Sequence, residues 1–144
     1  MFTRILVCSD GSEHSLDATL KAAELAKSQG AHLTVLHVCH VPTVTPPFTG
    51  APTLAGPLLD KYIRDLHAAV LARTIPVIKA LGVCIDVIEE VGSPIDVIAR
   101  IANTQDFDLV VIGSRGVSLD KADKLGSVCH GVIHSVFCPV MIVR

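Results

Sequence analysis

Aromatic residues are scarce in this 144-residue chain, which has no Trp, one Tyr and four Phe. The core must therefore consist of aliphatic side chains, as is typical of buried parallel strands. The same scarcity removes the stacking platforms of single-stranded nucleic-acid binders, and the formal net charge of −2 provides no basic surface. We therefore expect no nucleic-acid partner. The length predicts a single domain over residues 1–144.

Membrane and secretion signals are missing too. No run approaches 18 apolar residues, so no membrane insertion is expected, and Met1–Arg4 leads straight into a strand instead of a signal peptide. The five cysteines are odd in number and form no C-x-x-C pair. Such a set fits reduced thiols better than a disulfide framework, and it predicts a cytoplasmic location.

What the chain does have is a regular alternation of strand-like and helix-like segments. Ser93-Pro94 has the residues of a helix start, whereas Gly30 and Gly82 have those of helix ends. Alternation of this kind indicates a parallel sheet with helices on both faces. Runs rich in β-branched residues predict five strands, at residues 5–8, 31–38, 83–91, 108–112 and 140–143.

Prolines mark two places along the chain. The segment Pro42 to Pro57 contains five prolines and two glycines, which is typical of a surface loop. Pro76 falls inside the helical run 58–81. It lacks a backbone donor, so we expect it to kink or split that helix.

The most informative motif follows the strand at 108–112. Gly113-Ser114-Arg115-Gly116 comes directly after it, and nine further residues lead to Gly126-Ser127 at a helix start. Glycines let the backbone approach an anion, and a helix start offers unpaired N–H groups, so the pattern predicts a phosphate site. The alternative is that the glycines simply form a tight turn.

Ligands of open parallel sheets lie beyond the carboxyl ends of the strands, where the strand order reverses. This rule selects Cys8 to Ser12 after the first strand, His37 to Cys39 at the second, and Ile112 with the glycine loop after the fourth. We expect these three segments to border one crevice.

With these motifs, the chain resembles the universal stress proteins of the single-domain, ATP-binding type. In that family G-x2-G-x9-G-(S/T) marks the ATP binders, and this chain satisfies it. The resemblance implies an open five-stranded parallel sheet of order 3-2-1-4-5, a Rossmann-like fold of the adenine nucleotide alpha hydrolase type. The matching segments are 5–12, 36–38, 91–94, 108–116, 126–128 and 138–144, and the four motif residues are Gly113, Gly116, Gly126 and Ser127.

The resemblance also implies a role for each site residue, with ATP as ligand, ADP or AMP as alternatives, and Mg²⁺ as an optional ion. Cys8 and Cys129 depart from the family, in which proline is common at the first position and a hydroxyl residue at the second. Cys129 therefore weakens one phosphate contact. By resemblance, adenine packs near Cys8 and Ser9 and meets the backbone of Val38, Asp10 lies beside the ribose and phosphates, Ile112 and Gly113 border the ribose, and Gly116, Gly126, Ser127, Val128 and Cys129 line the phosphate path.

Two hypotheses on function follow. The first is a nucleotide-dependent regulatory module of the stress response that acts on an unknown protein partner. The second is a slow ATP hydrolase, for which only Asp10, Arg115, Lys121 and Lys124 are candidates, and these form no recognisable catalytic set. Walker A spacing and G-x-G-x-x-G are both absent from the sequence. Asp10 has a further alternative role, as the cap of a helix that starts near Ser12.

Histidines and cysteines suggest further chemistry only weakly. His130, His134 and Cys138 recur every four residues, but Cys138 precedes Pro139 at a strand entrance and no fourth ligand is evident, so we predict no metal site. His37 is predicted to be a hydrogen-bonded structural histidine. Cys8 is predicted to be a small buried side chain instead of an oxidisable thiol.

The last strand, Val140–Val143, is expected at an edge of the sheet. Members of the family that the chain resembles dimerise there. We therefore predict a homodimer in which two such strands pair antiparallel across a two-fold axis.

Overall fold

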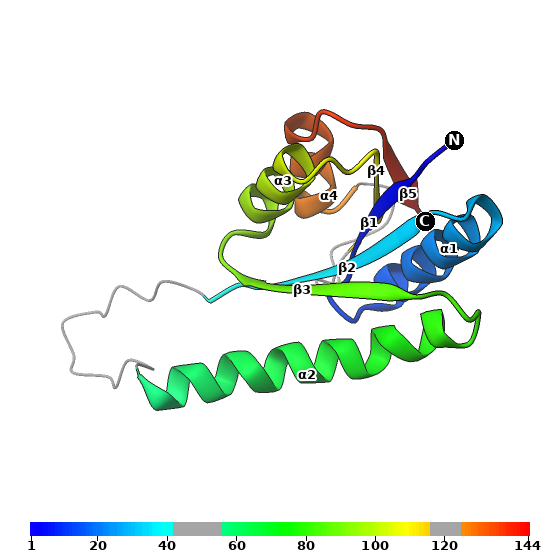
Figure 1. Ribbon diagram of the computed structural model, residues 1–144. Coiled ribbons are helices and arrows are strands. Elements are labelled where there is room, and N and C mark those ends of the chain that lie inside the picture. Colours follow the sequence, from blue (N-terminus) through cyan, green and yellow to red (C-terminus); the bar gives the residue numbers. More distant parts are fainter. Residues whose placement is uncertain (42–55, 116–124) are drawn as a thin grey trace.

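A computed structural model describes residues 1–41, 56–115 and 125–144 (Figure 1). Strands and helices alternate along these residues, as the sequence predicts. The elements are β1 (Arg4–Cys8), α1 (Glu13–Gln29), β2 (His32–Cys39), α2 (Pro57–Lys79), β3 (Ile85–Val91), α3 (Pro94–Thr104), β4 (Leu109–Gly113), α4 (Ser127–Ser135) and β5 (Val140–Val143).

The five strands form one parallel sheet of order β3-β2-β1-β4-β5, which confirms the predicted topology. In the middle of the sheet, Val7 of β1 pairs with Val35 of β2 and with Val111 of β4. The chain runs outward from β1 to β3, then crosses to β4 and continues outward to β5. The strand order therefore reverses between β1 and β4, and a ligand crevice is expected beyond their carboxyl ends.

Helices cover both faces of this sheet. Along β1, Ile5 and Val7 belong to the core beneath α1 and α2, whereas Leu6 and Cys8 belong to the core beneath α3 and α4. Small side chains let α1 pack closely, and its core-facing alanines are almost fully buried; they are Ala18, Ala22, Ala23 and Ala26. Each face thus has its own aliphatic core, built without tryptophan.

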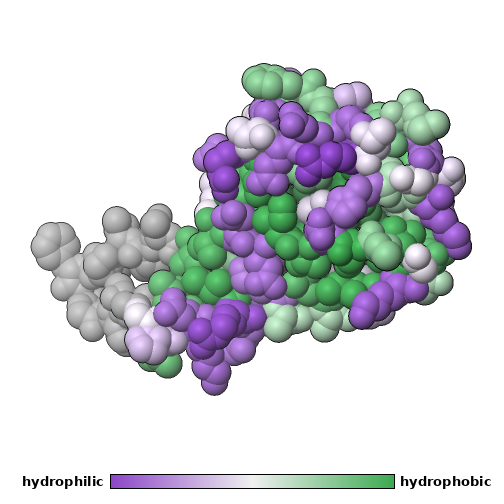
Figure 2. Space-filling view, in the orientation of Figure 1, coloured by the Kyte–Doolittle hydropathy of each residue, from purple (hydrophilic) through white to green (hydrophobic). Residues whose placement is uncertain are grey.

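The edge strand β3 is less well covered. Val87 and Val91 are 39% and 46% exposed. Figure 2 shows hydrophobic residues gathered in the middle of the face that carries β3, with hydrophilic residues around them. None of the helices in the described ranges is long and apolar enough to cross a membrane.

Of the two predicted effects of Pro76, the split is wrong, because α2 continues through this residue to Lys79. Ala72, whose carbonyl loses its helical donor, and Pro76 are both exposed, so water can hydrogen-bond to that carbonyl. Pro76 also lies in the last turn of the helix, where little regular structure remains to be disturbed. Of the predicted loop, residues 42–55 lie outside the described part of the chain.

Candidate functional site

The carboxyl ends of β1, β2 and β4 lie next to one another, as the sequence predicts. Ser9, just after β1, donates its N–H to the carbonyl of Leu36 at 3.0 Å, so β1 and β2 remain paired to this point. Beyond β4, the N–H of Gly126 reaches the carbonyl of Ser114 at 2.7 Å. These contacts bring the start of α4 to the reversal point of the sheet.

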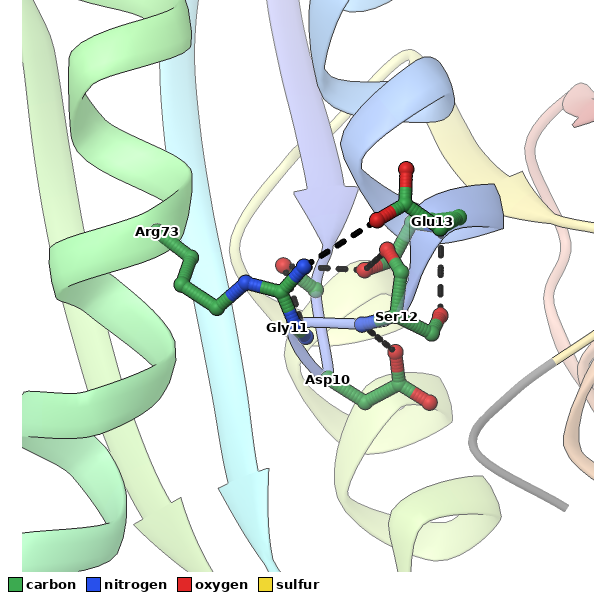
Figure 3. A network of polar contacts seen from close by, with 7 residues as sticks. Asp10, Gly11, Ser12, Glu13 and Arg73 are labelled. Carbon is green, nitrogen blue, oxygen red and sulfur yellow. Dashed lines mark hydrogen bonds and ion pairs between the residues drawn. The ribbon is translucent and has the colours of Figure 1, made fainter.

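Asp10 lies at the entrance to α1 with its side chain exposed (Figure 3). Its Oδ1 accepts from the N–H of Ser12 at 3.0 Å, while the hydroxyl of Ser12 accepts from the N–H of Ser15 at 3.3 Å. The cap of α1 is therefore Ser12, and the hypothesis that Asp10 caps this helix is wrong. Asp10 shapes the turn that precedes the helix, and its Oδ2 accepts no hydrogen bond from the described residues.

The Ser9 side chain points into the protein. It is buried, its Oγ lies 2.8 Å from Thr74 Oγ1 and 3.2 Å from Ser15 Oγ, and it accepts from the N–H of Gly11 at 3.3 Å. This hydroxyl is fully engaged inside the protein. Any contact of Ser9 with a ligand must therefore come from its backbone.

Both predicted site cysteines face the core beneath α3 and α4. Burial raises the pKa of Cys8 to about 12, and burial also raises the pKa of Cys129. Neither thiol ionises at neutral pH, so neither is a reactive nucleophile. Because the Cys129 side chain is buried, only its backbone N–H remains available to an anion. Ile112 belongs to the same core, and Val38 packs against it.

Gly113 has a packing role that the motif does not reveal. A Cβ at this position would lie 2.7 Å from the carbonyl oxygen of His14 and 3.1 Å from its Cβ. The first turn of α1 therefore lies directly on the end of β4. Gly116 and residues 117–124 lie outside the described residues, and Arg115 is the last residue before them.

The start of α4 presents backbone donors beside the carboxyl end of β4. Gly126 is its N-cap, and the N–H of Gly126 is already donated to Ser114, so it is not free for a ligand. The N–H groups of Ser127, Val128 and Cys129 occupy the first turn, where no intrahelical acceptor exists. No acceptor for them is found among the described residues, and the turn has no acidic side chain. Together with the positive end of the helix dipole, these amides favour an anion.

Two buried histidines contact each other between β2 and α2, and sequence reasoning missed one of them. His37 on β2 and His67 on α2 are both buried, with their Nδ1 atoms 2.6 Å apart. The prediction that His37 is a hydrogen-bonded structural residue is confirmed. Burial, and then the nearby His67, lower the pKa of His37 to about 4. The His37 ring is therefore neutral at pH 7, and the contact between the two Nδ1 atoms is a hydrogen bond whose donor is set by the ring tautomers.

The sequence suggests the histidines of α4 only weakly as metal ligands. The rings of His130 and His134 lie with their centroids 4.8 Å apart on α4. In the residues that the structure describes, no three His, Cys, Asp or Glu side chains are arranged to hold an ion.

Comparison with known proteins decides the family. The sequence model of the universal stress protein family matches residues 1–144. The chain belongs to this family. It is 35% identical to the universal stress protein YxiE of Bacillus subtilis, over the full length of both proteins.

Solved structures of the family share the fold. A universal stress protein in complex with cAMP is 25% identical, with a TM-score of 0.72, covering 99% of this chain and 97% of that one. The universal stress protein of Archaeoglobus fulgidus in complex with dAMP is 23% identical, with a TM-score of 0.70, covering 99% and 98%. Because its identity is only 23%, the similarity to the dAMP complex supports the fold alone.

Proposed function

We propose that this universal stress protein is a regulatory module that binds an adenine nucleotide at the carboxyl edge of its sheet. The observation that carries the proposal is the first turn of α4 at the reversal point of the sheet, which offers three amides that have no acceptor among the described residues. A family relative in complex with cAMP supports the ligand class.

The nucleotide we propose is ATP, with ADP and AMP as alternatives. Its phosphates lie along the amides of Ser127, Val128 and Cys129 and the exposed hydroxyl of Ser127. Its ribose lies between Asp10 and the end of β4, and its adenine against the ends of β1 and β2 near Val38. Asp10 beside phosphates is repulsive unless it accepts from the ribose hydroxyls or shares Mg²⁺ with the ligand, so Mg²⁺ remains optional.

Binding is expected to raise thermal stability. A ligand at a hundred times its Kd adds about 2.7 kcal/mol to the free energy of unfolding. Melting curves with millimolar ATP, ADP, AMP and cAMP, each with and without Mg²⁺, measure this effect and rank the ligands. Absence of a shift with every nucleotide would contradict the proposal.

The variant Val128→Pro tests the amides directly. Proline is tolerated in the first turn of a helix, so the variant removes one N–H without breaking α4. A hydrogen bond to a charged group contributes about 1.5–3 kcal/mol, so ATP affinity should fall at least about tenfold. Val128→Ala keeps the amide and serves as the control. Equal ATP binding by the two variants would exclude the Val128 amide from the site.

We further propose that the protein is a homodimer through β5, which lies at the open edge of the sheet. The carbonyls of Pro139 and Val143 accept from β4, so the alternate residues Val140 and Ile142 direct their backbone groups outward. Ile142→Pro removes an outward N–H while leaving the β4 pairing intact. Sedimentation should show a dimer for the wild type and a monomer for this variant, with Ile142→Val as control. A monomeric wild type would overturn the proposal.

A further inference from the structure

The inner face of α2 contacts β2 and the residues that follow β1, two of the three strands whose ends meet at the reversal point. His67, Val70 and Thr74 are spaced three and four residues apart, so they lie on one side of the helix. His67 meets β2 through its ring contact with His37, and the Val70 side chain lies 3.5 Å from the position of a Cβ on Gly11. Thr74 reaches the residue after β1. The helix thus supports the loop that carries Asp10 from behind.

Proton accounting fixes the direction of the Thr74 contact. The Thr74 hydroxyl donates to the carbonyl of Val70 at 2.8 Å, so it accepts from Ser9 at 2.8 Å. The Ser9 hydroxyl in turn accepts from the N–H of Gly11 at 3.3 Å. A continuous chain of hydrogen bonds therefore runs from the backbone of the loop into α2. Thr74 is 0% exposed, so its hydroxyl has no water as an alternative partner.

This chain holds the residues on both sides of Asp10. Ser9 precedes it and Gly11 follows it, and Gly11 adopts a left-handed backbone with φ +81°. Both neighbours are anchored through the Ser9 hydroxyl, while the Asp10 carboxylate itself remains exposed beside the crevice. The ion pair between Arg73 and Glu13 lies on the same side (Figure 3), at 3.2 Å, but both side chains are exposed and such pairs contribute little.

We propose that Thr74 is a positioning residue of the nucleotide site, which sets the Asp10 loop through the Ser9 hydroxyl without touching the ligand. The inference rests on the nucleotide binding proposed above. Removing the Thr74 hydroxyl takes away the nearer acceptor of the Ser9 hydroxyl and leaves it only the longer contact with Ser15 Oγ at 3.2 Å. The tie between the loop and α2 is then lost, and the loop is free to take other conformations. The ordering of the loop must then come from the binding energy, which weakens affinity.

Three variants separate positioning from a purely structural role. Thr74→Val keeps the shape but removes the hydroxyl, and Thr74→Ser restores it. Thr19→Val is the matched control, because Thr19 is also 0% exposed but its hydroxyl donates within α1, to the carbonyl of Ser15 at 2.7 Å. Titration calorimetry with ATP, well below the melting temperature of each variant, measures the affinity of the folded protein.

We expect Thr74→Val to bind ATP about tenfold more weakly than the wild type, with Thr74→Ser and Thr19→Val close to the wild type. Hydrogen exchange of the Gly11 amide, measured without nucleotide, should accelerate in Thr74→Val alone. Unchanged affinity and unchanged Gly11 exchange in Thr74→Val would overturn the positioning role while nucleotide binding stands. A wild type that binds no nucleotide would overturn both proposals, and that result is recognised before any variant is compared.

Discussion

Replacing Gly113 with alanine is expected to destabilise the protein by about 3 kcal/mol in the absence of any nucleotide. The new Cβ would lie 2.7 Å from the His14 carbonyl oxygen and 2.8 Å from its carbonyl carbon. These are backbone atoms in the first turn of α1, which cannot rotate away as a side chain can. To make room, α1 must move off β4, although its buried alanines fix it against the sheet.

The matched control is Gly82→Ala. Gly82 has a left-handed backbone conformation, with φ +71°, but no atom lies within 4 Å of the position that a Cβ would occupy. Its substitution costs only the left-handed backbone preference, about 1–2 kcal/mol. Urea unfolding of both variants without ligand checks the difference. If Gly113→Ala unfolds no more easily than Gly82→Ala, the close contact with α1 is not what requires this glycine.

This prediction bears on how the glycine motif is interpreted. From the sequence, Gly113 looks like a residue that lets backbone approach a phosphate. The structure gives it a second requirement, the approach of α1, whose residues are distant in sequence. Close packing against α1 and the proposed approach of a phosphate would each select glycine at this position, and a linear motif cannot separate them.

The fold was predictable because its signals are local. Aliphatic runs and the helix starts between them give the element order, and the structure confirms the parallel sheet and its strand order. Local rules failed at Pro76, where exposure of the Ala72 carbonyl lets the helix continue. They also began β3 at residue 83 instead of Ile85, because apolar residues just before a strand look like part of it.

For the candidate site, the sequence predicted which strand ends come together but not the directions of the side chains. The carboxyl-edge rule brings together the ends of β1, β2 and β4 without any knowledge of contacts. It does not reveal that Ser9 faces inward or that Cys129 lies in the core, because that depends on where α2 and α3 pack. His67 carried no signal, since it lies 30 residues from its partner His37 on a different element.

That histidine pair leads to the second large effect, a loss of stability in mild acid. The unfolded chain protonates His37 near its ordinary pKa of 6.5, whereas burial and then His67 lower the pKa in the folded protein to about 4, with Asp10 acting in the opposite direction. Between these values the unfolded state binds more protons. The contribution of His37 to the free energy of unfolding is therefore complete above pH 6.5 and is lost as the pH falls toward 4.

Urea unfolding at pH 7.5 and at pH 5.0 should differ by about 2 kcal/mol for the wild type. The double variant His37→Leu/His67→Leu removes the buried pair and should lose most of this difference. His32→Leu, which removes an exposed histidine of the same strand, should retain it. An equal acid response in the double variant would show that other groups cause it. The ring signals of His37 in an NMR titration give the decisive check, because neutrality down to about pH 4 is required.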